Sequence, residues 1–235
     1  MKTIDVCLTP ELLFQHDLSH QTVVIVDILR ATSSMVTAFA HGVARIRPVA
    51  HPEACYVWRE RGYLIAGERD GQKIADFDLG NSPLEYQSDQ VAGQSLAMTT
   101  TNGTLAIAKA QGARQLIVGA FLNLSAVVDI LKTQNTSVVV VCAGWKGHVN
   151  LEDTLFAGAL ADQLQSHFRM GSDAALMASV AYRAARPDLL DFLSQSSHVQ
   201  RLQRLGCQPD IAFCLRESLY ETVPVLSDDY LVALT

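Results

Sequence analysis

Residues 22–34 of the chain read TVVIVDILRATSS. A short run of Val and Ile bounded by polar residues is typical of a strand buried on both faces. Asp27 falls where this strand should end, and Arg30 and Thr32 follow just before helical spacing begins. Because α/β proteins bind ligands where parallel strands end and helices begin, these residues predict a metal-assisted anion site. The alternative is structural: Asp27 and Arg30 form an ion pair, and Thr32 or Ser33 caps the helix.

The composition indicates a chain with a sizeable core. Its 235 residues are 49% apolar and 18% charged, and a net charge of −6 comes without a Lys/Arg cluster. This excludes a disordered chain and argues against nucleic-acid binding. We see no signal peptide and no apolar stretch near the ~18 residues of a membrane span. Five scattered cysteines suit reduced thiols, so we expect a cytoplasmic protein that does not bind membranes; a homodimer is only a general expectation.

Strand and helix patterns alternate along most of the chain, which predicts one three-layer α/β/α domain over residues 1–235 with a mostly parallel or mixed sheet. The register is hardest to read after residue 195. The expected strands cover residues 1–9, 23–28, 44–49, 63–66, 96–99, 115–118, 137–142, 211–215 and 223–226. The expected helices cover residues 31–40, 52–61, 105–111, 125–133, 150–168, 172–185, 187–194 and 198–205, with a connection of at most one helical turn at 10–20.

The chain also echoes itself. Gly112 follows Gly42 by 70 positions, and each glycine closes a unit of strand, polar turn and helix that a further strand follows. The two units, about residues 20–90 and 95–165, predict an internal duplication of a β-α-β unit. Such a duplication would place both polar turns at the same edge of one sheet.

Several carboxylate side chains lie at the expected strand-to-helix turns, and one more lies in the loop at residue 68. Mg²⁺ typically takes one or two carboxylates and shares a phosphate with the substrate. Asp27, Glu68, Glu152 and Asp153 are the candidate metal ligands. Glu152 and Asp153 are adjacent on an expected helix, about 100° apart, so only one should face the site. The alternative for this pair is that both acids stabilise the first turn of the helix.

The stretch TTTNGT at residues 99–104 supplies hydroxyls and backbone donors without charge. It resembles an anion cradle at the start of a helix, although it is not a Walker loop, and a simple capping run is the alternative. Arg30 can hold a phosphate or another anion with two hydrogen bonds. The candidate substrate-binding residues of these two turns are Arg30, Thr32, Thr100, Thr101, Asn102, Gly103 and Thr104. Asn81, in the loop before the second turn, is a further candidate.

The third turn, CAGWKG at residues 142–147, follows the most hydrophobic strand. Cys142 is either a low-pKa nucleophile or, more commonly for such a residue, a small core side chain. Lys146 either adds a positive charge to the site or is a solvated loop lysine. The histidines show no metal-ligand spacing, and we expect four of them to lie on the surface: His41, His148, His167 and His198.

The motifs VVIVDILRATSS, GER with FDLGNSP, TTNGT and CAGW.G..NLEDTLFAGAL, in this order and spacing, resemble the 2-phosphosulfolactate phosphatase (ComB) family over roughly residues 4–226. The resemblance implies an α/β/α fold unrelated to the common phosphatase folds. It also implies Mg²⁺-dependent hydrolysis of 2-phospho-3-sulfolactate to 3-sulfolactate in coenzyme M biosynthesis. Ser33 and Ser34 stand where family members typically have Thr, a mild departure.

Carried onto this chain, the resemblance places residues of all four motifs in the active site. They are Asp27, Arg30 and Thr32; Glu68 and Asn81; Thr100, Thr101, Asn102, Gly103 and Thr104; and Cys142, Gly144, Glu152 and Asp153. We therefore expect a Mg²⁺-dependent phosphatase for a small anionic phospho-acid, with water, Asp27 or Cys142 as the nucleophile. Two alternatives stay open: a cysteine hydrolase of the isochorismatase-like type that uses Asp27 and Cys142, and a non-catalytic binder of a phosphorylated metabolite.

Overall fold

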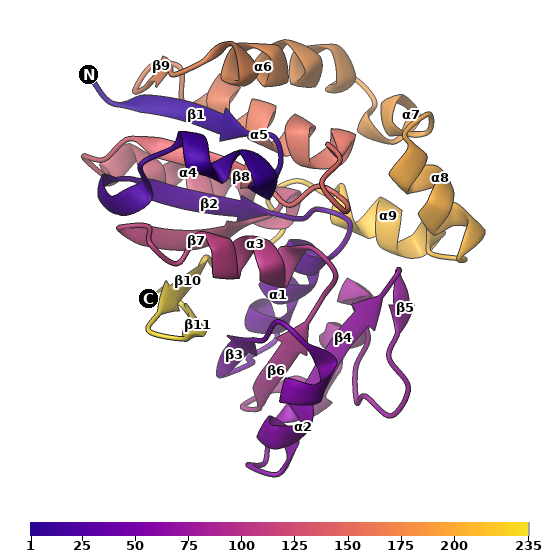
Figure 1. Cartoon of the computed structure of the whole chain (residues 1–235). Helices are drawn as coiled ribbons and strands as arrows, with labels where there is room; N and C mark the ends of the chain where they lie inside the picture. The colour runs from indigo at the N-terminus through magenta and orange to yellow at the C-terminus, as the bar shows by residue number, and fades with distance from the viewer. Residues whose placement is uncertain (235) are drawn as a thin grey trace.

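Within residues 1–234, which the computed structural model describes, eleven strands form one continuous sheet (Figure 1). Their order across the sheet is β5-β4-β6-β3-β11-β10-β7-β2-β8-β1-β9. The strands are β1 (Thr3–Cys7), β2 (Thr22–Val26), β3 (Arg45–Pro48), β4 (Leu64–Arg69), β5 (Gln72–Lys73), β6 (Ser95–Thr99), β7 (Gln115–Gly119), β8 (Val138–Cys142), β9 (Arg169–Met170), β10 (Pro224–Ser227) and β11 (Tyr230–Ala233).

Helices cover both faces of this sheet, so the predicted three-layer α/β/α class is confirmed. The α-helices are α1 (Ala31–Ala40), α2 (Pro52–Arg59), α3 (Gly103–Lys109), α4 (Leu124–Thr133), α5 (Leu151–Gln163), α6 (Asp173–Ala185), α7 (Leu189–Leu193), α8 (Ser197–Arg204) and α9 (Gln208–Cys214). Short 3₁₀ helices are η1 (Pro10–Gln15), η2 (Leu18–His20), η3 (Pro83–Gln87), η4 (Asp89–Val91) and η5 (Phe121–Asn123). None of the helices within residues 1–234 combines the length and hydropathy that a membrane span requires.

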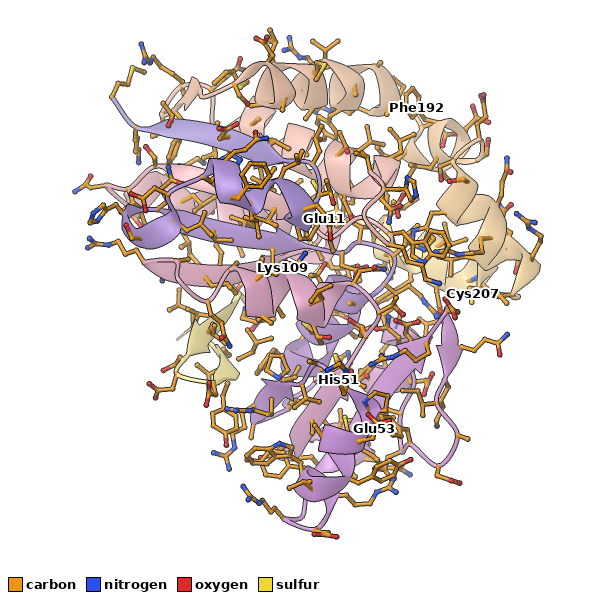
Figure 2. The ribbon with its side chains drawn as sticks, in the orientation of Figure 1. Glu11, His51, Glu53, Lys109, Phe192 and Cys207 are labelled. Atoms are coloured by element: carbon orange, nitrogen blue, oxygen red, sulfur yellow. The ribbon has the colours of Figure 1, made fainter. Side chains whose placement is uncertain are left out.

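The quoted stretch forms the central strand and its following helix, as predicted. Every residue of β2 is buried, and the strand pairs in parallel with both β7 and β8, with Val24 opposite Ile117 and Val140. In Figure 1, α3 crosses the front of these strands while α4 and α5 lie behind them. An ion pair of 2.9 Å between Glu11 and Lys109, both labelled in Figure 2, ties η1 to α3. The C-terminal ends of three parallel strands therefore meet at one edge, where Asp27 lies.

The sheet has two halves joined by an antiparallel hairpin, and both halves are parallel except for the edge strand β5, which runs antiparallel to β4. The hairpin β10–β11 lies between β7 and β3, and Leu231 of β11 faces Ile46 of β3. Each expected β-α-β unit crosses from one half of the sheet to the other, and the two units cross in opposite directions. The first runs from β2, which pairs with β7 in one half, to β3, which pairs with β6 in the other, and the second runs from β6 back to β7. This arrangement agrees with a duplicated unit, which stays a prediction.

The structure corrects three sequence-based expectations. Residues 211–215, expected as a strand, lie in and just after helix α9 because Pro209 occupies its first turn and Ile211 and Cys214 are buried one helical turn apart. Strand β4 continues beyond residue 66 to Arg69 and turns into β5, where a loop was expected. A second strand, β11, follows the expected C-terminal strand.

Candidate active site

A small polar cavity opens at the C-terminal ends of the central strands. Its walls come from the turns after β2, β4, β6 and β8 and from helix α8, which lies at the right in Figure 1. Six of the predicted site residues line it: Asp27, Arg30, Glu68, Asn81, Thr101 and Asn102. Six further lining residues were not among the predicted site residues: Leu29, Gly71, Trp145, His198, Arg201 and Leu202.

Asp27 is buried beside the start of helix α3. A methyl group added at Gly103 would come within 2.9 Å of its Oδ2 atom, so a glycine is required for this close approach. The pKa of Asp27 is raised to about 6, chiefly by burial and also by the charges of Glu68 and Glu152, while His198 opposes the increase. The predicted proximity of Asp27 to the 100–104 turn is therefore present, and the pocket concentrates negative charge.

Thr32 fixes the turn that carries Asp27. Its Oγ1 atom accepts a hydrogen bond from the Asp27 backbone N–H at 3.0 Å and donates one to the Asp27 carbonyl oxygen at 2.9 Å. The hydroxyl is fully buried and does not line the cavity. The predicted substrate-binding residue Thr32 thus acts on the site through the backbone of Asp27.

Asp153 ties two of the turns together. Its Oδ1 atom accepts the N–H of Ile28 at 2.8 Å, and Oδ2 accepts the N–H of Gly144 at 3.1 Å. Burial holds the pKa of this carboxyl well above its ordinary value, with a further increase from Glu152. Gly144 has φ of +59°, and a methyl group there would lie 2.4 Å from the His148 carbonyl oxygen, so it serves the turn geometry. Both predicted residues position the backbone beside the cavity.

Glu152 and His198 form a buried pair. Glu152 Oε1 lies 2.5 Å from His198 Nδ1, and Asn150 Nδ2 lies 3.1 Å from the same nitrogen. This contact leaves Nε2 of His198 for the cavity that the ring lines. The surface position expected for His198 was wrong, because packing of α8 against the start of α5 buries a ring that its local sequence marks as polar. Of the adjacent acids, Glu152 is the one with a free oxygen.

Glu68 connects the end of β4 to the turn after β6. Its Oε1 atom accepts the N–H of Thr101 at 2.6 Å and Oε2 accepts the N–H of Gly71 at 2.7 Å. Such charge-assisted bonds hold a carboxylate firmly and reduce its freedom to bind an ion with both oxygens. Glu68 lines the cavity with its orientation already set.

The threonine-rich turn divides into capping and lining residues. Thr100 and Thr104 bond reciprocally, each side-chain oxygen accepting the other residue's backbone N–H at 3.1 Å. The alternative reading of a capping run therefore applies to these two residues. Thr101 and Asn102 line the cavity instead, and Asn102 Oδ1 accepts the backbone N–H of Lys146 at 3.1 Å.

Arg30 is oriented by a buried ion pair that the sequence analysis missed. Its Nη1 atom lies 2.5 Å from Asp210 Oδ2, Nη2 donates to the Gly71 carbonyl at 2.7 Å, and Ser82 donates to the other Asp210 oxygen at 2.6 Å. Cys207, labelled in Figure 2 beside α8 and α9, lies 3.4 Å from the same Nη1. Arg30 is thus a clamped cation whose charge already has a partner.

A second guanidinium, that of Arg201, lies over an aromatic ring of the cavity wall. Its central carbon is 3.8 Å from the centroid of the Trp145 ring. Burial lowers the pKa of Arg201, and the carboxylates Glu152, Asp70 and Glu68 counteract that loss. Lys146, by contrast, is half exposed, pairs with Asp70 at 2.7 Å and does not line the cavity. The solvated-lysine alternative therefore fits Lys146 better than substrate binding.

Cys142 is fully buried at the end of β8 and does not line the cavity. Burial raises the pKa of its thiol well above the ordinary value, and Asp153 raises it further. A nucleophilic cysteine needs the opposite environment, one that stabilises the thiolate. These properties favour the core role over the catalytic one.

Several buried polar atoms at the cavity have no hydrogen-bond partner within residues 1–234. They are Asn81 Oδ1, Thr101 Oγ1, Glu152 Oε2 and Arg201 Nε. Native proteins leave few such atoms, so these acceptors and donors are available to a bound ligand. No three His, Cys, Asp or Glu side chains in this part of the chain form a ready metal site. The oxygen donors nonetheless suit Mg²⁺, which keeps several waters and shares substrate oxygens.

Comparison with known proteins shows which family the chain belongs to. A family model described as 2-phosphosulpholactate phosphatase matches residues 7–229. A Thermotoga petrophila protein is 42% identical over 206 residues, covering 88% of this chain and 89% of its own length. A protein of Caldanaerobacter subterraneus subsp. tengcongensis is 39% identical over 217 residues, covering 90% of each chain, and one of Synechocystis sp. is 38% identical over 224 residues, covering 92% of each. All three relatives are named probable 2-phosphosulfolactate phosphatase. The chain belongs to the 2-phosphosulfolactate phosphatase family.

Proposed function

We propose that this chain is a Mg²⁺-dependent phosphatase that hydrolyses 2-phosphosulfolactate to 3-sulfolactate and inorganic phosphate. The observation that carries the proposal is that the wall of one cavity holds both an acceptor and donors without a partner within residues 1–234: Asn81 Oδ1, Arg201 Nε and the Thr101 hydroxyl. Glu152, whose Oε2 atom also has no partner there, contacts the lining residue His198. A metal-assisted reaction on an anion needs both kinds of group within one site. The family name supplies the substrate.

The metal would be held by oxygens that the fold leaves free. Asp27 and Glu152 are the first candidates, with the amide oxygen of Asn81 beside them, because both oxygens of Glu68 and of Asp153 already accept backbone N–H groups. A bound Mg²⁺ would offset the negative charge that builds up on the phosphate oxygens. Without it, the buried carboxylates would repel a phosphorylated acid.

The chain's own groups would bind and orient the substrate. Arg30, fixed by Asp210 and the Gly71 carbonyl, presents donors of known direction. The Thr101 hydroxyl is buried and free to donate to a phosphate oxygen. His198, oriented through Nδ1 by Glu152, faces the cavity with the nitrogen that can hold or give a proton. Preorganised donors of this kind stabilise charge without reorganising during the reaction.

A phosphate-release assay tests the proposal. Purified protein is given small phospho-acids, including phosphosulfolactate and phospholactate, with Mg²⁺ or with EDTA. We expect phosphate release that requires Mg²⁺ and is strongest with phosphosulfolactate. Absence of turnover with every phospho-acid and metal tested would contradict the phosphatase assignment and leave the non-catalytic binder as the better reading.

Cellular setting and assembly stay proposals. All five cysteines are free thiols, four of them buried, which suits a reducing cytoplasm. We also keep the expectation of a homodimer and of no nucleic-acid partner. Size-exclusion chromatography with light scattering tests the first, and an electrophoretic mobility shift assay tests the second.

A further inference from the structure

The two guanidinium groups of the cavity differ in what balances their charge. Arg30 has Asp210 at 2.5 Å, and both side chains are less than one-tenth exposed. No carboxylate within residues 1–234 lies within 4.0 Å of Arg201, and its buried Nε atom has no hydrogen-bond partner there. A buried charged donor without a partner is costly, so its place in a cavity indicates an anionic ligand.

The indole of Trp145 packs against the guanidinium of Arg201 and restricts its orientation. The indole lies under the guanidinium at 3.8 Å, and its own backbone is held by two bonds to His148 of 2.8 and 2.9 Å. A guanidinium stacked by its face keeps its edge, with the N–H donors, free for an anion bound by two parallel hydrogen bonds. The nearby cation Lys146 is already paired with Asp70. Among residues 1–234, Arg201 is therefore an arginine of the cavity wall that has no carboxylate in direct contact.

We propose that Arg201, packed over the ring of Trp145, binds the sulfonate of the substrate and thereby selects sulfonated phospho-acids. This inference rests on the proposed function. 2-Phosphosulfolactate carries a phosphate, a carboxylate and a sulfonate on three adjacent carbons. Of these, the carboxylate and phosphate are the better ligands of a hard cation beside Asp27 and Glu152. The sulfonate is weakly basic and weakly hydrated, and it matches a guanidinium that is itself weakly hydrated and stacked on an indole.

Steady-state kinetics of the Arg201→Gln variant with two substrates test the inference. Phosphosulfolactate carries the sulfonate, and 2-phospholactate lacks it. We expect kcat/KM for phosphosulfolactate to fall about 100-fold, since a charge-assisted double hydrogen bond is lost. The fall in kcat/KM for phospholactate, which lacks the sulfonate, should be at least about tenfold smaller. Arg201→Lys, which keeps the charge without the planar fork, should recover only part of the loss. Arg204→Gln is the matched control, because Arg204 is an exposed arginine on the same helix.

Two results would overturn the inference: an equal loss with both substrates, or wild-type protein that does not prefer the sulfonated substrate. Product binding separates this failure from failure of the proposed function. If the wild type hydrolyses neither substrate, the phosphatase assignment fails, and thermal shift with 3-sulfolactate and with lactate decides the sulfonate contact. A shift by 3-sulfolactate that is present in wild type and Arg204→Gln but absent in Arg201→Gln supports the contact. An equal shift in Arg201→Gln refutes it.

Discussion

At the scale of single residues, Asp27 is buried, yet its proposed role as a metal ligand requires its carboxyl group to be ionised. The pKa of this carboxyl is about 6 in the folded chain, against an ordinary value of 3.8, chiefly because burial disfavours the ionised form. At neutral pH the carboxyl group of Asp27 is still ionised, although its surroundings favour the protonated form. A bound cation would reverse that preference, which connects the stability of the protein to the occupancy of its site.

The first prediction concerns the pH dependence of stability in metal-free protein. Because the folded-state pKa of Asp27 exceeds the unfolded value, the folded chain keeps its proton longer as pH rises. The contribution of Asp27 to the free energy of unfolding should therefore fall between about pH 4 and about pH 6 and stay level above. Urea denaturation in EDTA across this range measures it. Asp27→Asn should remove this part of the slope, and Asp129→Asn, at an exposed acid, should not; an unchanged slope in Asp27→Asn contradicts the prediction.

A second prediction uses the same variants with Mg²⁺. Addition of Mg²⁺ should raise the melting temperature of the wild type more at pH 7 than at pH 5, since the cation needs the ionised carboxylate. Asp27→Asn should lose most of this gain and lose more than about 1,000-fold in kcat/KM. Differential scanning fluorimetry and phosphate release measure the two effects. A full Mg²⁺ shift in Asp27→Asn would place the metal elsewhere.

The third prediction concerns Cys142. Its thiol is buried and its pKa lies well above the ordinary value, so Cys142→Ala should keep Mg²⁺-dependent phosphate release within about threefold. The smaller side chain should lower the free energy of unfolding by about 1–2 kcal/mol. Cys55→Ala, at another fully buried thiol that lies outside the cavity, is the matched control. Selective loss of activity in Cys142→Ala at normal stability would restore the cysteine-hydrolase alternative.

At the scale of secondary structure elements, the site is built from turns that hold one another. Asp153 at the start of α5 bonds to the turns after β2 and β8, and Glu68 at the end of β4 bonds to the turn after β6. Each of these carboxylates accepts backbone N–H groups with both oxygens: Asp153 from two other turns, and Glu68 from the turn after β6 and from Gly71 in the turn that follows β4 itself. Their role is to set the positions of Asp27 and Thr101, so substitutions there should act through geometry.

The fourth prediction tests the close packing of α3 against the β2 turn. Gly103→Ala places a methyl group 2.9 Å from Asp27 Oδ2 and 2.7 Å from Ala31 Cβ, so the helix start must move. We expect kcat/KM to fall at least about tenfold, since small displacements of positioned groups are costly, and the free energy of unfolding to fall by about 1–2 kcal/mol. Gly112→Ala, with no atom within 4 Å of the added methyl group, is the control. Equal activity of the two variants would remove the packing argument.

The sequence could predict the site where its residues follow strands, and it could not where they come from helices. Asp27, Thr101 and Asn102 stand at turns whose apolar strands are visible in the sequence, so their meeting at one edge follows from parallel topology. His198 and Arg201 lie in SHVQRLQR, whose polar letters describe an ordinary surface helix. These two residues reach the cavity wall because α8 packs against α5 and Trp145. A local sequence pattern does not reveal such tertiary packing. Asp210 was not recognised as a site residue, because the residues directly after it, 211–215, were expected to form a strand instead of a helix.

At the scale of the whole molecule, the cavity straddles the two halves of the sheet. Asp27 and Trp145 follow strands of the β7-β2-β8-β1 half, whereas Glu68 and Thr101 follow strands of the β4-β6-β3 half. The C-terminal hairpin joins these halves, and its pairing to each neighbour passes through one residue pair, Val225 with Ile117 and Leu231 with Ile46. The stability of this seam therefore bears on the geometry of the site.

The fifth prediction tests the seam with Leu231, which is fully buried between the halves. Leu231→Ala should lower the free energy of unfolding by about 3 kcal/mol, the usual cost of a large cavity in a core. It should also lower kcat/KM several-fold, because a looser seam lets Glu68 and Asp27 move relative to each other. Leu234→Ala is the control, since Leu234 is near the same end of the chain but 41% exposed, and it should cost less than about 0.5 kcal/mol. Urea denaturation and phosphate release of both variants decide the point: a stability loss in Leu231→Ala without any loss of activity would mean that each half holds its own catalytic groups independently of the seam.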